Sequence, residues 1–289
     1  MNVYREFANA EDIDREYNAV SMVSDLNAYM AFDSDANETT RNELKCTLDV
    51  PYGHNVDETL DIFPAESADA PVVIFIHGGY WKSMSSRDFS LVAKGLVAIG
   101  FTVVIPNYSL CPSVVLPIIT HQNRAAVAWV YEYIHTFNGD SGNIFICRHS
   151  AGAQQVGMLA ATDWEGEYRV SKEAIRAGVP ISGIFDLSPL YYSWLQPTLR
   201  LTHDCILRES ALFQLPAGDM PLLVSVGADE SSEFIRQARE YQTAAEQAGN
   251  SADLYIQEER NHFTTIRDLF FEDGRFTQRL LVFIEQNSR

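Results

Sequence analysis

The chain has 289 residues, of which 46% are hydrophobic and 21% are charged, as in an ordinary soluble globular protein. This length is near the upper limit for one hydrophobic core, and we predict a single domain over residues 1–289. The formal net charge of -18 repels phosphate backbones and anionic lipid headgroups. We therefore expect neither nucleic acid nor a membrane surface as a partner.

The cysteines and the amino terminus indicate the compartment. The four cysteines lie far apart, with no C-x-x-C pair: Cys46, Cys111, Cys147 and Cys205. This pattern predicts reduced, mostly buried thiols, with neither a zinc site nor a disulfide framework. The first residues, MNVYREFANAEDIDREYN, carry acids where a secretory peptide needs a basic start and an apolar stretch. We expect a cytoplasmic protein that needs no metal or organic cofactor.

Residues 1–45 form a polar, acidic amino-terminal arm with scattered aromatic side chains. The arm shows no strict strand alternation, so we expect helical turns packed on a core.

Apolar strands alternate with helical stretches in the rest of the chain. The strand-like segments are rich in β-branched residues: PVVIFIH from Pro71, FTVVIP from Phe101, NIFIC from Asn143, AGVPIS from Ala177 and PLLVSVG from Pro221. The helix-like stretches between them begin at Ser86, Leu116, Ser150 and Ser231. Segments apolar throughout are typical of strands buried on both faces of a parallel sheet. The alternation predicts an α/β fold, with a mostly parallel central sheet and helices on both faces.

One stretch, residues 183–216, interrupts the alternation between two predicted strands. It contains several aromatic residues and two interior prolines, and we predict that it forms a small inserted cap. The sequence shows no repeat or low-complexity tract that would indicate a linker between domains.

Ser150 stands where the strand NIFIC passes into a helix. This is the setting of a nucleophile elbow, in which a sharp turn raises a serine hydroxyl above the sheet. The small residues Ala151 and Gly152 suit such a turn, but Arg148 occupies the position of the first glycine in the usual G-x-S-x-G motif. A serine that only caps the helix is the alternative interpretation.

A second motif, HGGYW at residues 77–81, follows the strand PVVIFI. Glycines in such a loop allow backbone amides to turn towards an anion. We predict an oxyanion hole in which Gly78, Gly79 and Tyr80 supply the loop and Ala151 supplies the amide after the nucleophile. A simple glycine-rich turn is the alternative.

A base and an orienting carboxylate follow in the order that this chemistry needs. Asp229 comes just after the strand PLLVSVG, and His262 follows a further strand-like segment, DLYIQ. Only His262 lies after Asp229, unlike the other histidines: His54, His77, His121, His135, His149 and His203. A structural role for His262 remains open, and Glu230 is an adjacent acid. Either acid could instead cap the following helix.

These motifs together resemble the kynurenine formamidase (arylformamidase) family and related small esterases of the α/β-hydrolase superfamily. The landmarks occur in that family's order: EYN at Glu16, HGGYW, NYSLCP from Asn107, HSAGAQ, GIFDLSPL from Gly183, GADESSEF from Gly227 and NHF from Asn261. The resemblance covers nearly the whole chain. It implies Ser150, Asp229 and His262 as the catalytic triad, with the HGGYW loop as oxyanion donor.

Arg148 departs from this family, which has glycine there. Burying an unpaired arginine is costly, so we expect its side chain to reach water or a carboxylate. The arginine could point outward, face the substrate as a cation, or lower activity as a lesion. The candidate substrate-binding residues are His77, Trp81, Arg148, His149, Tyr191 and Tyr192. The aromatic residues among them could line a pocket for an aryl substrate or pack the core of the cap.

The sequence therefore predicts a serine hydrolase that cleaves a small, aromatic amide or ester through an acyl-enzyme. An aryl formamidase acting on N-formylkynurenine-type substrates and a short-chain carboxylesterase remain alternatives within this class. A hydrolase-fold protein that binds a ligand without efficient catalysis is an alternative of another class, because of Arg148. Homodimer formation through the apolar cap is compatible with each of them.

Overall fold

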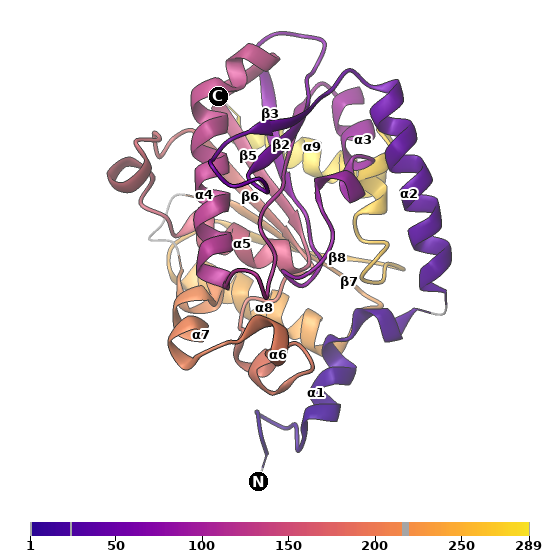
Figure 1. The fold of residues 1–289 in the computed structure, drawn as a ribbon, viewed down its shortest axis with the longest axis vertical. Helices are drawn as coiled ribbons and strands as arrows, with labels where there is room; N and C mark the ends of the chain where they lie inside the picture. Colours follow the sequence, from indigo (N-terminus) through magenta and orange to yellow (C-terminus); the bar gives the residue numbers. More distant parts are fainter. Residues whose placement is uncertain (1, 24, 216–219, 289) are drawn as a thin grey trace.

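The computed structural model describes residues 2–23, 25–215 and 220–288. An eight-stranded sheet forms its centre, in the order β1-β2-β4-β3-β5-β6-β7-β8 (Figure 1). The strands are β1 (Thr47–Pro51), β2 (Thr59–Phe63), β3 (Ala70–Ile76), β4 (Thr102–Pro106), β5 (Gly139–His149), β6 (Ile175–Ile181), β7 (Leu222–Gly227) and β8 (Ala252–Gln257). Strands β1, β2 and β4 pair antiparallel, and the pairs from β4 through β3 to β8 are parallel. This confirms the predicted mostly parallel sheet.

Helices cover both faces of the sheet (Figure 1). Buried residues of α4 (Leu116–Tyr133), α5 (Ala151–Ala160) and α8 (Ser232–Gln247) belong to one core cluster. Those of α3 (Val92–Ala98) and α9 (Arg275–Asn287) belong to the other. Within β3, Val72 and Ile74 face the first cluster, whereas Val73 and Phe75 face the second. Period-two alternation of apolar side chains between two cores explains why these strands are hydrophobic throughout.

Three elements were not anticipated from the sequence. Strands β1 and β2 extend the sheet with antiparallel pairs, and the burial of β1 alternates between exposed and half-buried residues. Helix α9 carries one buried stripe, which includes Phe276, Leu280 and Ile284. Such half-polar segments lack the continuous apolar runs that mark the central strands.

The predicted cap, residues 183–216, folds as a series of short helical pieces up to Leu215, and Pro216 lies outside the described residues. The pieces are η5 (Ser188–Tyr192), α6 (Gln196–Leu199), α7 (His203–Glu209) and η6 (Ala211–Phe213). Helix α7 is joined to the sheet-covering helices by Gln154 Nε2, which donates to the Glu209 carbonyl at 2.6 Å. This contact ties the segment to α5, the helix that follows Ser150.

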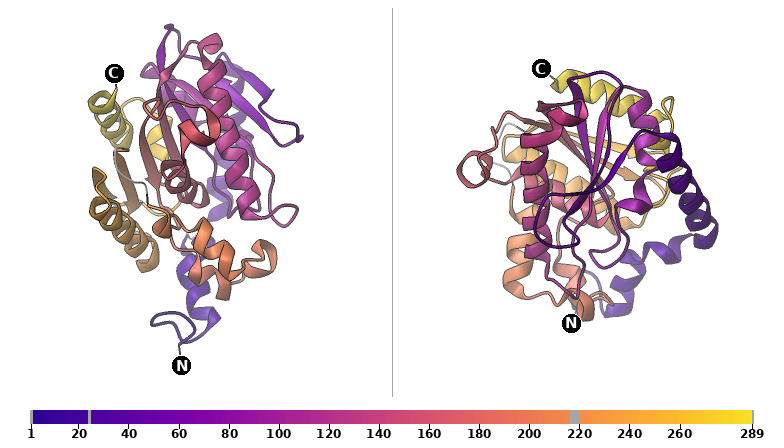
Figure 2. Two further views of the ribbon diagram at one scale, coloured as in Figure 1. Left: turned by 90° about the vertical axis from the view of Figure 1, so that its left-hand side faces the viewer. Right: turned by 45° about the horizontal axis from the view of Figure 1, so that its top comes forward.

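The amino-terminal arm comprises α1 (Ala10–Tyr17), η1 (Ala19–Met22) and α2 (Leu26–Glu43), which confirms the expected helical turns, while Met1 and Ser24 lie outside the described residues. Helix α1 of the arm packs against α8 and against the short helices around α6 (Figure 2), whereas α2 contacts the segment before α3. The fully buried Tyr17 anchors the arm. Its hydroxyl donates to Glu233 at 2.7 Å and accepts from Gln237 Nε2 at 2.6 Å.

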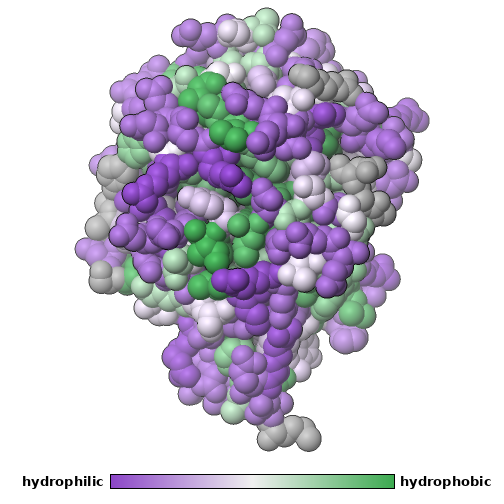
Figure 3. All heavy atoms as spheres, turned by 180° about the vertical axis from the view of Figure 1, so that it is seen from behind, coloured by the Kyte–Doolittle hydropathy of each residue, from purple (hydrophilic) through white to green (hydrophobic). Residues whose placement is uncertain are grey.

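The surface is largely hydrophilic on the face shown in Figure 3, where apolar areas are separate from one another. No helix in the described ranges is both long enough and apolar enough to cross a membrane. All four cysteines are free thiols, with Cys111 and Cys147 buried and the other two half-buried.

Replacing Tyr17 with phenylalanine should lower the free energy of unfolding by about 1–3 kcal/mol, because Glu233 and Gln237 each lose a buried partner. Chemical denaturation followed by circular dichroism measures the change. Tyr191→Phe is the matched control, since the Tyr191 side chain is exposed and should tolerate loss of its hydroxyl. Equal stability of the two variants would show that the arm is not anchored through Tyr17.

Candidate active site

Ser150 occupies a sharp turn between β5 and α5. Its backbone has φ 58° and ψ -130°, a conformation that a non-glycine residue adopts only when the surrounding structure enforces it. The Ser150 amide donates to the Ile181 carbonyl of the neighbouring strand at 2.9 Å, which holds the turn in place. The strand-to-helix turn predicted at this serine is therefore present, with the first turn of α5 directly behind the hydroxyl.

His262 lies between Ser150 and a carboxylate. Its Nε2 is 2.9 Å from Ser150 Oγ, and its Nδ1 is 2.7 Å from Glu230 Oε2. A carboxylate only accepts hydrogen bonds, so Nδ1 carries the hydrogen and Nε2 of the neutral ring accepts from the serine hydroxyl. All three side chains are nearly inaccessible to solvent. This geometry suits proton transfer from Ser150 to His262.

The carboxylate partner of His262 is Glu230, and the prediction of Asp229 is wrong on this point. Residues 228–229 form a turn after β7 in which Asp229 is exposed, while Glu230 folds back under the histidine. The turn packs so closely on the loop after β8 that a Cβ atom at Gly227 would overlap the Arg260 carbonyl. The longer glutamate side chain then reaches His262 from the next position along the chain.

Hydrogen bonds satisfy both oxygens of the buried Glu230 carboxylate. While Oε2 binds His262, Oε1 accepts from Ser182 Oγ at 2.5 Å and from the Gly227 amide at 2.8 Å. A buried carboxylate without donors would be strongly destabilising, and these hydrogen bonds offset the cost of its burial. Sequence reasoning missed Ser182, whose only signal is its position at the carboxyl end of a predicted strand.

The HGGYW loop lies against the nucleophile. A Cβ atom added to Gly78 would lie 3.1 Å from Ser150 Cβ, closer than such atoms normally approach. Gly79, Tyr80 and Trp81 all have positive φ, at 103°, 51° and 56°. Two non-glycine residues in this region indicate local strain that the surrounding structure must offset.

The amino-terminal arm holds this strained loop. The Tyr80 hydroxyl donates to the Tyr17 carbonyl at 2.5 Å, and the Tyr80 ring meets Trp194 edge-on at 5.2 Å between centroids.

Among the described residues, the amides of Gly79 and Tyr80 donate to no protein acceptor, and the Ala151 amide opens α5 without an intrahelical partner. These amides are the groups that could stabilise an oxyanion at Ser150.

His77 and Trp81 do not face a substrate space, contrary to expectation. Both are fully buried. His77 Nδ1 donates to the Gly78 carbonyl at 2.8 Å, and its ring stacks on Tyr108 at 4.2 Å. Burial lowers the pKa of His77 to about 4, so the ring is neutral at physiological pH. These residues support the loop from inside.

Arg148 points neither outward nor to a carboxylate, which corrects the expectation that it must reach one or the other. It is fully buried, donating from Nη1 to the Gly152 carbonyl at 2.8 Å and from Nη2 to Asn123 Oδ1 at 2.7 Å. Burial lowers the pKa of Arg148 well below its usual value, partly offset by the phenols of Tyr108 and Tyr52. The guanidinium therefore braces the first turn of α5 against α4.

The remaining predicted binding residues divide into two groups. His149 is buried, and its Nε2 lies 2.7 Å from the His262 carbonyl oxygen, so this nitrogen is engaged within the protein. Tyr191 and Tyr192 are exposed on η5 and contact each other edge-on. Their role in binding a substrate stays a prediction. Two aromatic rings that the sequence analysis did not single out, Phe234 and Phe263, flank His262 at 4.6 and 5.8 Å between centroids.

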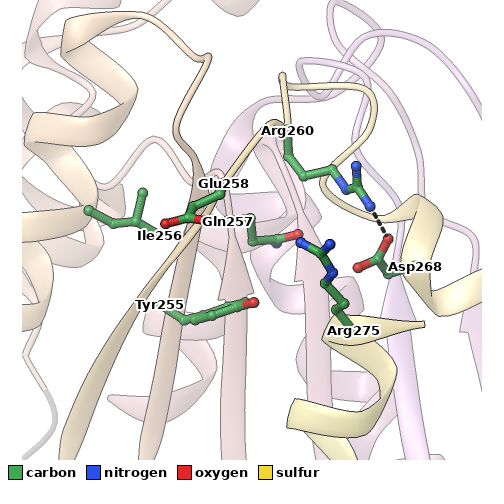
Figure 4. Close-up of a pocket in the computed structure, with 7 residues that line it drawn as sticks. All are labelled: Tyr255, Ile256, Gln257, Glu258, Arg260, Asp268 and Arg275. Atoms are coloured by element: carbon green, nitrogen blue, oxygen red, sulfur yellow. Dashed lines mark hydrogen bonds and ion pairs between the residues drawn. The ribbon is translucent and has the colours of Figure 1, made fainter. Parts of the chain in front are cut away.

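A hollow of about 260 Å³ is lined by residues of β8, of the segment that follows it and of the start of α9 (Figure 4). Arg260 and Asp268 point towards one another at its rim and form an ion pair of 2.7 Å. Asp268 also accepts from the Phe276 amide at the start of α9, at 3.1 Å. These contacts fasten the His262 loop to α9. In the described part of the chain, no cluster of three or more His, Cys, Asp or Glu residues is arranged to hold a metal ion.

Comparisons with known proteins find similarity along most of the chain. Residues 60–213 match the BD-FAE family model. The chain is 31% identical to a kynurenine formamidase of Danio rerio, over 90% of this chain and 89% of that protein. It is 28% identical to a kynurenine formamidase of Salmo salar, over 94% of this chain and 96% of the other.

Two solved structures share the fold. A Silicibacter protein provisionally described as a thioesterase superimposes with a TM-score of 0.83 at 28% identity, covering 92% of this chain and 98% of its own. A carboxylesterase from a metagenomic library superimposes with a TM-score of 0.70 at 16% identity, covering 97% and 96%. The second likeness supports the fold alone.

Arg148→Lys should lower the free energy of unfolding by about 1–3 kcal/mol, because a lysine lacks the planar fork that reaches both Gly152 and Asn123. Denaturant titration measures this change. The same substitution at Arg279, which forms an exposed ion pair with Asp253, should change stability by less than about 0.5 kcal/mol. Similar losses in the two variants would contradict the bracing role of Arg148.

Acid should destabilise the protein in part through His77. Its pKa in the folded protein, about 4, lies below the ordinary 6.5. Between these two pH values the unfolded chain binds a proton that the buried ring does not, so the free energy of unfolding falls as pH drops from 6.5 towards 4. The loss amounts to about 3 kcal/mol, at about 1.4 kcal/mol for each pKa unit.

His77→Asn provides the test, because asparagine can still donate to the Gly78 carbonyl but does not titrate. Free energies of unfolding measured from pH 7 to pH 4 should fall less steeply in this variant than in wild type. Identical acid dependence in the two proteins would refute a neutral, buried His77.

Proposed function

Because the chain belongs to the kynurenine formamidase family of α/β-hydrolases, we propose that it cleaves a small aryl amide or ester through Ser150, His262 and Glu230. The observation that carries this proposal is the continuous pair of hydrogen bonds, 2.9 Å from Ser150 to His262 and 2.7 Å from His262 to Glu230. In catalysis, His262 takes the Ser150 proton as Oγ attacks the substrate carbonyl carbon.

The tetrahedral oxyanion would be held by backbone amides of the HGGYW loop and by the Ala151 amide at the start of α5. His262 then gives its proton to the departing amine or alcohol as the carbon–heteroatom bond breaks. Water then attacks the acyl-enzyme as His262 accepts its proton, and His262 returns that proton to Ser150 Oγ as the bond between Oγ and the acyl carbon breaks. Glu230 keeps the imidazole in the required tautomer and stabilises the imidazolium that forms twice in each cycle.

An aryl formamide of the N-formylkynurenine type is the substrate class that we favour. The Danio rerio and Salmo salar relatives are both named kynurenine formamidases. Phe263 and Trp194 place partly exposed aromatic surface near His262 and Tyr80 respectively. A short-chain ester is the second candidate, because the same acyl transfer through Ser150 and His262 also cleaves esters.

The position of Arg148 favours an active enzyme over an impaired binding protein. Its guanidinium bonds to Gly152 and Asn123, and Ser150 keeps both its positive φ and its hydrogen bond to His262. The arginine therefore replaces the usual glycine without displacing the nucleophile.

Glu230→Gln should lower kcat by about 10³–10⁴-fold, because an amide in place of the carboxylate no longer stabilises the imidazolium or selects its tautomer. Asp229→Asn is the matched control one residue away, and its exposed side chain should leave kcat within about threefold of wild type. Release of formate from N-formylkynurenine and hydrolysis of p-nitrophenyl acetate give the rates. The assignment of Glu230 is wrong if Asp229→Asn has the larger effect.

Labelling by a fluorophosphonate probe tests the nucleophile independently of the substrate. Wild type should label, and Ser150→Ala should not. If wild type labels and cleaves the ester without releasing formate from N-formylkynurenine, the carboxylesterase alternative replaces the formamidase one. Absence of labelling in wild type would overturn the proposed function as a whole.

A further inference from the structure

The backbone carbonyl of His262 accepts two hydrogen bonds from side chains. His149 Nε2 lies 2.7 Å from this oxygen, and Thr265 Oγ1 lies 3.1 Å from it. A carbonyl oxygen can only accept, so His149 carries its hydrogen on Nε2. Glu230 therefore holds the ring of His262, while His149 and Thr265 hold its main chain.

His149 connects the central strand β5 to the loop that carries His262. It is the last residue of β5, an 11-residue strand near the middle of the sheet, and it directly precedes Ser150. His262, in contrast, lies in an irregular loop after β8, the strand at the edge of the sheet. One side chain therefore connects the segment of the nucleophile to the segment of the base.

The same imidazole also borders the oxyanion loop. A Cβ atom built on Gly78 would lie 3.7 Å from His149 Nδ1, while the His149 and His262 rings are 4.8 Å apart between centroids. Burial, together with the neighbouring His262, lowers the pKa of His149 well below its usual value. A neutral ring avoids placing a second positive charge beside the imidazolium that His262 becomes during the reaction.

We propose that His149 is a positioning residue, which fixes the distance between His262 Nε2 and Ser150 Oγ by holding the His262 carbonyl. This inference rests on the proposed function, because it assigns a role within that reaction. Glu230 sets the orientation of the imidazole ring, but a ring can be well oriented and still stand too far from the nucleophile if its loop moves. A misplacement of about 1 Å can reduce a rate about a hundredfold.

The role differs from the direct substrate binding predicted for His149 from the sequence. Its Nε2 is committed to the His262 carbonyl, and the ring is only 6% exposed. A residue that acts on the geometry of the base should change kcat and leave KM unaltered, whereas a residue that binds substrate should change KM.

A matched pair of substitutions isolates the hydrogen bond. Glutamine and methionine have similar length, and glutamine can place an N–H donor near the position of His149 Nε2, whereas methionine has none. We expect His149→Met to lower kcat for p-nitrophenyl acetate about tenfold or more with KM unchanged, and to slow fluorophosphonate labelling of Ser150 equally. His149→Gln should stay within about threefold of wild type in both assays.

A spectroscopic measurement separates positioning from general loss of structure. The hydrogen between His262 Nδ1 and Glu230 should give a downfield proton resonance in wild type and in His149→Gln. We expect that resonance to broaden or disappear in His149→Met, even where the two variants have the same melting temperature.

Several outcomes would overturn the proposal. Equal kcat values for the methionine and glutamine variants, or a change confined to KM, would show that the donor does not position the base. A folded glutamine variant that has lost more than tenfold in kcat would do so even if the methionine variant does not fold. These results presuppose a wild type that labels at Ser150, so they are distinct from failure of the proposed function, in which wild type does not label.

Discussion

The buried carboxylate of Glu230 is the constraint around which the rest of the site is arranged. A carboxylate removed from water must receive hydrogen bonds on both oxygens, and here the donors come from the residue that follows β6, from the end of β7 and from the loop after β8. Each of these donors fixes one segment relative to the others. The hydrogen bonds that the Glu230 carboxylate needs thereby hold together the segments at the ends of β6, β7 and β8.

The parallel sheet makes this convergence possible. Strands β3, β5, β6, β7 and β8 end at the same edge, so residues more than a hundred positions apart in sequence meet there. The helices on both faces contribute rigidity, and the ion pair of Arg260 with Asp268 attaches the loop of the base to α9. Because the edge strand β8 has only one neighbour, its loop depends on such side-chain contacts more than the elbow of Ser150 does.

Much of this architecture was predictable from the sequence, for identifiable reasons. Continuous apolar runs revealed the central strands, and the small residues after Ser150 and the glycines of HGGYW marked the two tight loops. The choice between Asp229 and Glu230 was not predictable, because it depends on how a two-residue turn rotates after β7. The direction of the Arg148 side chain was not predictable either, since its acceptors are a backbone carbonyl and the side-chain amide of Asn123 on another helix. Strand β1 and helix α9 lacked a strong apolar signal because one side of each is exposed, and β2 lacked one because the buried Asp61 interrupts a short apolar run.

The burial of Arg148 has a consequence for how this sequence can change. Its guanidinium depends on Asn123, a residue of α4 that lies 25 positions earlier in the sequence. Loss of the amide oxygen at position 123 would leave the buried guanidinium short of an acceptor, whereas a glycine in place of Arg148 would leave an empty space and an orphaned amide. A substitution at only one of these two positions should therefore destabilise the protein more than a paired substitution that removes both groups.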